Sequence, residues 1–338
     1  MAGSATKKTM LKLLAVAMVG YASWSIVQQE KSPSQNADKV ITLRLSENLT
    51  DSNPTTVAMR KFASLVEEKT NGSVRVKVYA NAQLGQGTES IEQVRLGVVD
   101  FARVNSVILS NVSPSIGVFT LPYIFKDSRH SRKVLDGPVG SDVLKDLEDY
   151  NLTAFHYMEA GFRSFYTRQG ITINKLADLK GLKIRVQPSP ISIRMVELLG
   201  GVPTPMNYGE VYSAIQTGVI DGAENDHVSY IMSGHYEVAP IYSEDKHLSP
   251  PAILIMNHTK FNSLSDAHQQ AIREASFESA AFQRGLMDQG AADAIVKLKA
   301  AGVTITPLDN APFAEAVKPI YDEYPAYKKL IERIRNID

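Results

Sequence analysis

The sequence predicts an α/β protein with two domains of like topology, and three observations predict this class. The chain has 338 residues, 44% of them apolar, which is enough for two domains with a core each. Strand and helix patterns alternate over residues 41–102 and again over 182–223, as in parallel sheets covered by helices. Residues 97–103 share four identities with 218–224, at the same place in both stretches. This repetition indicates two matching βαβα units.

The first unit contains the expected turn and helix signals in order. Pro54 fits the first turn of its first helix, and Asn71-Gly72 is a typical stop signal. Gly97 ends its second helix. Its expected strands, which are apolar or alternate apolar and polar residues, span residues 41–45, 74–78 and 98–102.

The second unit repeats this order. Pro190 opens a helix that Gly200-Gly201 ends, and Gly218 ends the next helix. Its expected strands span residues 182–186, 202–206 and 219–223. Ligands of open α/β sheets bind beyond the carboxyl ends of the strands. The segments expected to converge on a shared cleft are therefore 46–48, 103–106, 185–189 and 222–226.

Three arginines point to the chemistry of this cleft. Arg103 and Arg185 follow strands, and Arg163 lies in an apolar setting where a lone guanidinium is costly. Each could make a structural ion pair instead. Several guanidinium groups at converging strand ends nevertheless favour capture of a small anion, because the planar fork matches a carboxylate.

Neutral and acidic hydrogen-bonding groups surround these arginines. Carboxylates and amides suit the hydroxyl groups of a polyol or sugar, because they accept or donate in pairs. A turn or helix cap is the alternative explanation for each residue alone, but as a set they favour a hydroxylated acid. The set consists of Glu47, Asn48, Asn105, Gln187, Asn207, Tyr208, Asn225 and His247.

One long helix is expected over residues 265–301. Ser265 can cap it, and an apolar stripe follows at helical spacing. Gly285 and Gly290 weaken it and could mark a bend. Unbroken, it would extend about 50 Å and brace both domains. The acidic and aromatic residues 321–327 are expected to form a final helix packed on one domain.

The first thirty residues are predicted to be a signal peptide rather than part of the fold. Lys7, Lys8 and Lys12 precede the uncharged run 13–27, which falls short of the roughly 20 residues that span a bilayer. An uncleaved anchor is the alternative. Residues 31–39 are expected to form a linker, and no other segment could cross a membrane. An exported chain without cysteine is typical of the Gram-negative periplasm.

Several classes of function are disfavoured. Thirty-six basic residues balance thirty-six acidic ones, so no net charge favours nucleic acid or an acidic membrane. Without cysteine there is no disulfide, thiolate metal site or cysteine nucleophile. The histidines lack ligand spacing, and the common nucleophile, zinc and phosphate motifs are missing, so we expect no metal and no cofactor. An acidic pair among Glu210, Asp221 and Glu224 keeps an exported enzyme as the alternative.

Six segments in order make the chain resemble the periplasmic solute-binding subunits of tripartite ATP-independent periplasmic (TRAP) transporters, the DctP-like family. The resemblance covers nearly all of residues 40–337. Its segments are Phe62-Ala63 with Thr70-Asn71-Gly72, Gln83-Leu84-Gly85, and residues 121–125, 161–165, 179–186 and 210–225.

This resemblance implies a two-domain periplasmic binding protein fold with parallel-type mixed sheets, hinge strands and a long helix spanning both domains. The first domain would comprise residues 40–160 plus 249–290, and the second 161–248 plus 291–338. Domain closure about the hinge would capture the ligand without catalysis.

The resemblance also assigns roles. Arg185 would bind the ligand carboxylate, Arg163 would be a second ligand arginine, and Asn225 would lie beside the carboxylate. The chain is most similar to the subgroup that binds sugar acids, in which Glu47 and Asn48 would hold hydroxyls. Arg103 and Gln187 support that subgroup, although the first loop departs from its pattern at residues 49–53.

The expected ligand is a hexuronate such as glucuronate or galacturonate, or an aldonate. C4-dicarboxylates, keto acids and aromatic acids are the rival ligands. The expected partners are the small and large membrane subunits of a TRAP permease, and the expected state is a monomer. A receptor that feeds a signalling kinase would bind its ligand in the same way.

Overall fold

The first of two sheets contains five strands. The computed structural model describes residues 40–338, so the expected signal peptide (1–30) and linker (31–39) lie outside the described residues. The first strand pairs parallel with its two neighbours, and the fourth in spatial order runs antiparallel to both of its own. The order is β2 (Val74–Tyr79), β1 (Ile41–Ser46), β3 (Phe101–Asn105), β10 (Ala252–Asn257) and β4 (Leu152–Met158).

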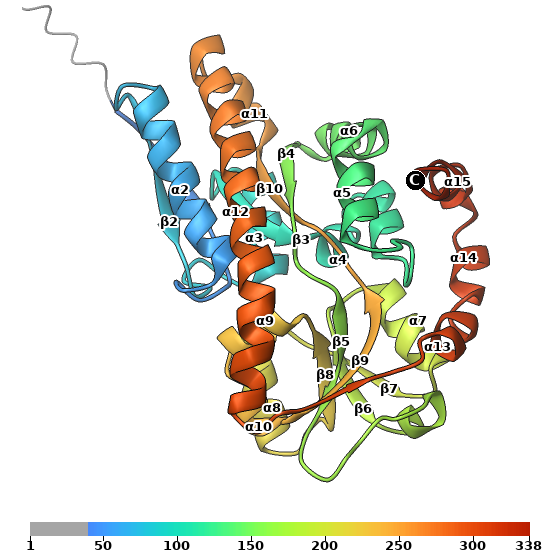
Figure 1. Cartoon of the computed structure of the whole chain (residues 1–338). Helices are drawn as coiled ribbons and strands as arrows, with labels where there is room; N and C mark the ends of the chain where they lie inside the picture. The colour runs from blue at the N-terminus through green and yellow to red at the C-terminus, as the bar shows by residue number, and fades with distance from the viewer. Residues whose placement is uncertain (1–39) are drawn as a thin grey trace, which may run out of the picture. The chain divides into compact units, whose positions relative to one another are not determined.

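The second sheet contains six strands and is also mixed. Its order is β11 (Thr304–Pro307), β9 (Ile241–Leu248), β5 (Arg163–Thr167), β8 (Gly222–Asn225), β6 (Lys183–Val186) and β7 (Val202–Pro205). β6 pairs parallel with β7 and β8, whereas β5 runs antiparallel to β8 and β9. We call the first sheet and its helices lobe A, and the second sheet and its helices lobe B (Figure 1).

Helices surround both sheets, as the alternating pattern predicts. In lobe A they are α2 (Pro54–Lys69), α3 (Gly87–Arg95), α4 (Ser106–Leu109), η1 (Pro114–Thr120), α5 (Ser128–Asp136), α6 (Pro138–Lys145), η2 (Asp146–Tyr150) and α11 (His258–Asn262). In lobe B they are η3 (Leu176–Leu179), α7 (Pro190–Leu198), η4 (Tyr208–Glu210), α8 (Val211–Gln216), α9 (His227–Met232) and α10 (His235–Val238). Both predicted α/β units are therefore present.

Two predicted strands begin three residues later than expected. β3 starts at Phe101 and β8 at Gly222, because a turn follows Gly97 and Gly218, whose φ angles are 72° and 74°. In that turn the repeated aspartate takes a backbone N–H from the neighbouring strand. Arg44 N donates to Asp100 Oδ2 at 2.7 Å, and Lys183 N donates to Asp221 Oδ2 at 2.9 Å.

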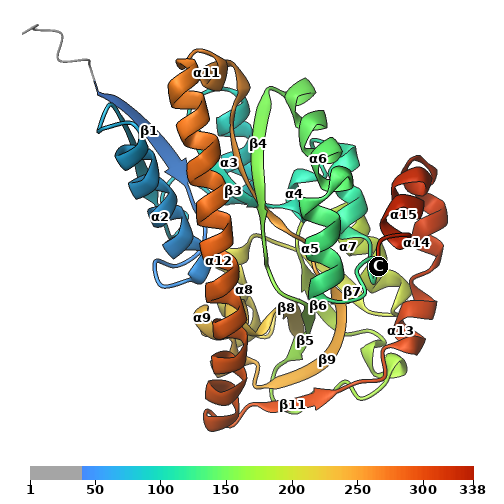
Figure 2. The same cartoon turned by 45° about the horizontal axis from the view of Figure 1, so that its top comes forward.

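The lobes are joined by hinge strands and by one long helix, which confirms the predicted architecture. The chain passes from β4 to β5 through residues 159–162 and returns from β9 to β10 through 249–251. Helix α12 (Asp266–Ala300) is continuous over 35 residues, and the Ser265 side chain caps it. It packs on α2 and β4 in lobe A and on α9 in lobe B (Figure 2).

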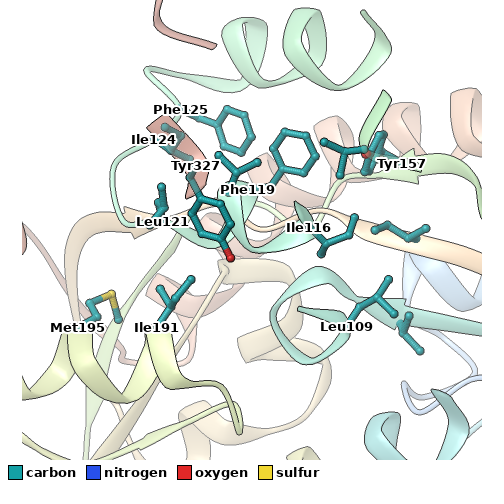
Figure 3. Packing of buried hydrophobic residues seen from close by; sticks show 14 of the residues in the cluster. Leu109, Ile116, Phe119, Leu121, Ile124, Phe125, Tyr157, Ile191, Met195 and Tyr327 are labelled. Carbon is teal, nitrogen blue, oxygen red and sulfur yellow. The ribbon is translucent and has the colours of Figure 1, made fainter. Parts of the chain in front are cut away.

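The C-terminal segment contacts both lobes, so the expectation that it packs on one domain is wrong. It contains α13 (Ala311–Ala316), α14 (Pro319–Glu323), η5 (Pro325–Tyr327) and α15 (Lys328–Arg335). α14 packs on α7, and α15 packs on α6. Tyr327 donates its hydroxyl to the Pro114 carbonyl at 2.7 Å. Figure 3 shows Tyr327 beside Ile191 and Met195 of α7 and Leu121 of lobe A, in one apolar cluster.

Over residues 40–338, no helix combines the length and the apolar character needed to cross a membrane.

Candidate functional site

A cavity lies between the two lobes, at the carboxyl ends of the parallel strands. Its volume is about 60 Å³, several times the roughly 10–15 Å³ that one water requires. In lobe A it is lined by the loop after β1 and by the end of β3, and in lobe B by the ends of β6 and β8. Glu159 of the β4–β5 crossover and Met287 of α12 complete the wall. This is the location that the strand-end rule predicts.

The cavity gathers most of the side chains selected from the sequence. Three of them lie outside its wall. Asn207 borders a narrower gap beside the cavity, whereas Glu47 and His247 are fully buried behind the arginines. Those that line the cavity are Asn48, Arg103, Asn105, Arg163, Arg185, Gln187, Tyr208 and Asn225.

Arg103 is neutralised within lobe A. Its Nε donates to Glu47 Oε2 at 2.8 Å, and its Nη2 donates to the other carboxylate oxygen of Glu47. Nη2 also donates to Asn48 Oδ1 at 2.8 Å. Glu47 is 0% exposed, and its Oε1 also accepts the backbone N–H of Leu49. Glu47 thus holds Arg103 and the loop in place, and Arg103 and Asn48 are the residues that face the cavity.

Arg163 is neutralised within lobe B. Its guanidinium donates to both carboxylate oxygens of Glu224, to the Glu224 carbonyl at 2.6 Å and to Asn225 Oδ1. Burial alone would raise the pKa of Glu224, but the Arg163 guanidinium and His247 lower it to about 2. Glu224 is therefore an anion at neutral pH, and Arg163 points Asn225 toward the cavity.

His247 supports this pair from behind. Its Nδ1 lies 2.9 Å from both carboxylate oxygens of Asp245, and its Nε2 lies 3.6 Å from Glu224 Oε2. Burial disfavours the imidazolium, but Asp245 and Glu224 outweigh it and raise the pKa of His247 to about 9. The ring also stacks on Phe165 with centroids 4.4 Å apart. His247 therefore acts on the cavity only through Glu224 and Arg163.

Arg185 differs from the other two arginines. Its Nε and Nη2 donate to the Met206 carbonyl at 3.1 and 2.9 Å, and its guanidinium lies 5.8 Å from the Tyr208 ring centroid. Among residues 40–338 no carboxylate forms an ion pair with it. The side chain is only 2% exposed, and burial lowers the pKa of its guanidinium. Arg185 is therefore a buried cation without an ion pair, since the acid that acts on it, Glu224, is bound by Arg163.

Sequence reasoning did not select several further residues of the wall, among them Asp226, Glu159 and Met287. Asp226 belongs to the predicted converging segment 222–226, so its position carried the signal. Glu159 and Met287 lie on the crossover and the long helix, and neither follows a parallel strand. Within the described part of the chain, no group of three His, Cys, Asp or Glu side chains could hold a metal ion.

Comparison with known families gives one extended match. The family described as bacterial extracellular solute-binding protein, family 7 (DctP), matches residues 45–327. A curated relative, the 2,3-diketo-L-gulonate-binding periplasmic protein YiaO of Escherichia coli, is 34% identical over 263 residues, which cover 77% of this chain and 80% of the relative.

Solved structures with sugar acids bound are similar over most of the chain. A TRAP periplasmic solute-binding protein of Xanthobacter autotrophicus with bound β-D-galacturonate is 39% identical, has a TM-score of 0.85, and covers 88% of this chain and 100% of its own. The corresponding protein of Roseobacter denitrificans with bound β-D-glucuronate is 37% identical, with the same TM-score and the same coverage.

Proposed function

Because this chain belongs to the DctP family of bacterial extracellular solute-binding proteins, the solute-binding subunits of TRAP transporters, we propose that it captures a hexuronate and delivers it to a TRAP permease. Glucuronate and galacturonate are the first candidates, since both are bound by similar proteins. The chain acts by binding alone, without catalysis.

The uncompensated charge of Arg185 carries this proposal. A buried guanidinium that donates only to a carbonyl and faces an aromatic ring lacks the partner that its charge requires. A ligand carboxylate supplies that partner in bidentate geometry. Arg103 and Arg163 already have such partners in Glu47 and Glu224, so Arg185 is the arginine that receives the acid.

The remaining wall suits hydroxyl groups. Tyr208 lies beside Arg185 and accepts a hydrogen bond from Asn225, so these two residues would border the carboxylate. Asn48 and Arg103 line the cavity from lobe A, and Gln187 lines it from the loop after β6. Those groups bind the hydroxyls. In this assignment Glu47 and His247 hold Arg103 and Arg163 in position, and Asn207 lies at the mouth.

Capture requires the lobes to separate and close again. Residues 40–160 plus 249–290 would move as one domain and 161–248 plus 291–338 as the other, with bending at the two strand crossovers and within α12 after Gly290. Closure removes water from the Arg185–carboxylate pair and so strengthens it.

The cellular setting follows from the family. We infer export by the N-terminal signal peptide into the periplasm, where the relative YiaO is placed by its name. The partners are the small and large membrane subunits of the permease, and the protein works as a monomer.

A ligand panel tests the proposal. Protein freed of ligand by unfolding and refolding is mixed with hexuronates, aldonates, C4-dicarboxylates, keto acids, aromatic acids and neutral sugars, and thermal unfolding is followed. A ligand at 1,000 times its Kd adds about 4 kcal/mol of stability, and we expect this shift with hexuronates. If only another class of acid raises the unfolding temperature, that class is the ligand and the hexuronate proposal is wrong. If neutral sugars raise it, the role proposed for Arg185 is wrong.

The arginine is then tested directly by calorimetry. Arg185→Ala should weaken hexuronate binding by about 2–5 kcal/mol, which is roughly 30- to 5,000-fold. The control is Arg75→Ala on β2, which removes an exposed ion pair with Glu67 of α2. This variant should bind as the wild type does. A loss below about fivefold at Arg185 would contradict the assignment.

A further inference from the structure

Asp226 presents an unused carboxylate oxygen in the cavity wall. It precedes α9, and its Oδ1 accepts the Ser229 backbone N–H at 3.0 Å, which caps that helix. The residue is only 3% exposed, and within residues 40–338 its Oδ2 is buried without a hydrogen-bond partner. A buried acceptor left without a partner is costly. An oxygen kept in this state at the wall of a binding cavity is therefore available to a ligand.

The crossover packs against the Asp226 side chain. Gly161 adopts a φ of +69°, and a Cβ at that position would lie 2.7 Å from the Asp226 Cβ. A glycine is required there, because any other side chain would push the crossover away from the carboxyl group. Asp226 is thus packed from the hinge side and meets the cavity on its other side.

Most charges near Asp226 are already paired. Arg163 is held by Glu224, and Glu159 is held by Arg132, which also binds Asp288. Asp226 also borders a second pocket, beneath the crossover. The charged and titratable groups that face Asp226 or line either cavity are Arg103, which Glu47 holds, and Arg163, Arg185, Tyr208, Glu224, His227, Tyr242, Glu244, Lys246, Glu159 and Asp288. In the cavity wall this leaves one unpaired cation, Arg185, and one unpaired acid, Asp226.

We propose that Asp226 contacts the bound acid through Oδ2 and takes up one proton from solvent when the acid binds. The inference rests on the proposed function. The ligand carboxylate occupies Arg185, and a second carboxylate in the same water-excluded cavity would repel it. Protonation removes this repulsion and gives Oδ2 a proton to donate to a ligand oxygen. Burial, which raises the pKa of Asp226 above its ordinary value even without ligand, supports this assignment.

The equivalent residue of lobe A shows that a neutral amide fits this position. Asn105 follows Asp100 by five residues, as Asp226 follows Asp221. Its Oδ1 accepts the Val107 backbone N–H at 2.9 Å and caps α4. Asp226→Asn should therefore keep the helix cap while removing the titratable group.

Calorimetry of D-glucuronate and D-galacturonate binding tests the proton uptake. Titrations run from about pH 5 to about pH 8, in pairs of buffers that differ in ionisation enthalpy. For the wild type we expect net proton uptake and an affinity that falls by up to about tenfold per pH unit above the pKa of free Asp226. Asp226→Asn should show neither effect. Asp127→Asn, at the cap of α5 away from the cavity, should behave as the wild type does.

The contact itself is tested with alanine. Asp226→Ala and Asp127→Ala each lose one helix cap, so their ligand-free unfolding temperatures should fall by similar amounts. Only Asp226→Ala should bind hexuronates at least about tenfold more weakly. Two results would overturn this inference and leave the proposed function standing. One is hexuronate binding that depends on Arg185 but takes up no proton, and the other is an unchanged affinity in Asp226→Ala. An absence of hexuronate binding in every variant, at every pH, would instead overturn the proposed function.

Discussion

The two lobes use the same strand register but distribute charge differently. Leu45 pairs with Phe101 in lobe A as Ile184 pairs with Gly222 in lobe B, and Asp100 and Asp221 bind the neighbouring strand alike. Counted from these aspartates, Arg103 of lobe A corresponds to Glu224 of lobe B. The third residue of β3 is thus a cation, and the third residue of β8 is an anion.

The antiparallel neighbour explains why this reversal matters. β10 lies against β3 as β5 lies against β8, and the registers place Ala252 of lobe A where lobe B has Arg163. Arg163 occupies Glu224, so the arginine on β6, Arg185, has no acid left to bind. In lobe A one arginine binds one glutamate, whereas lobe B has two arginines and one glutamate, which Arg163 binds. The comparison teaches that Arg185 is left free to bind a ligand because lobe B has one extra arginine, Arg163, on the hinge strand β5.

The largest expected effect on stability comes from replacing the two arginines that form buried ion pairs, Arg163 and Arg103. Arg163→Met leaves Glu224 as a buried carboxylate without its cation, and Arg103→Met does the same to Glu47. Each should lower the free energy of unfolding by about 3–5 kcal/mol, measured by denaturant titration of ligand-free protein.

The same substitution at Arg185 should have the opposite sign. Arg185→Met removes a buried cation that forms no ion pair, so the unfolding free energy of ligand-free protein should rise by about 1–3 kcal/mol, although hexuronate binding is lost. If all three substitutions destabilise the protein equally, the proposed charge difference between the lobes is wrong.

The next effect is a pH dependence that belongs to lobe B. The pKa of His247 in the folded protein, about 9, exceeds its ordinary value of 6.5. The protonated His247 therefore contributes about 3 kcal/mol to the free energy of unfolding. This contribution is complete below pH 6.5 and is lost as pH rises through 9. His247→Gln should remove this alkaline fall from a series of unfolding curves. His258→Gln, which alters a histidine of lobe A bonded to Thr153, should keep it.

The smallest expected effect on stability comes from the aspartate that both lobes share, Asp100 in lobe A and Asp221 in lobe B. Asp100→Ala and Asp221→Ala each remove a carboxylate that accepts a backbone N–H of the neighbouring parallel strand. Each should cost about 1–3 kcal/mol of stability, near the lower end because both sites border solvent. Unequal losses, measured by chemical unfolding, would show that the two turns are not energetically equivalent.

Much of the fold could be predicted because local signals and packing agree. Pro54, Pro190 and Ser265 begin their helices in the structure as the sequence indicates. The starts of β3 and β8 could not be predicted, since Val98 and Val219 are apolar but exposed. Their exposure depends on the turn that the repeated aspartate fixes, which is a contact between strands.

The position of the cavity was predictable from the strand ends. Which of its arginines is paired with an acid, and which is left to bind a ligand, was not predictable. Arg103, Arg163 and Arg185 look alike in sequence, and only their partners distinguish them. The pairing of Arg163 with Glu224 joins residues 61 positions apart, a separation at which local patterns carry no information. For the same reason Glu47 and His247 were grouped with residues of the wall, although they lie behind it.

The row of connections between the lobes has a mechanical consequence. α12 lies on one side, the two strand crossovers in the middle and the C-terminal segment on the other side, in both views (Figures 1 and 2). Joints arranged along a line permit rotation about that line and resist torsion across it, as in a long door hinge. In the proposed closure, each closing event would therefore bring the same two edges together in the same alignment. A receptor that closes reproducibly can distinguish sugar acids that differ only in the orientation of one hydroxyl.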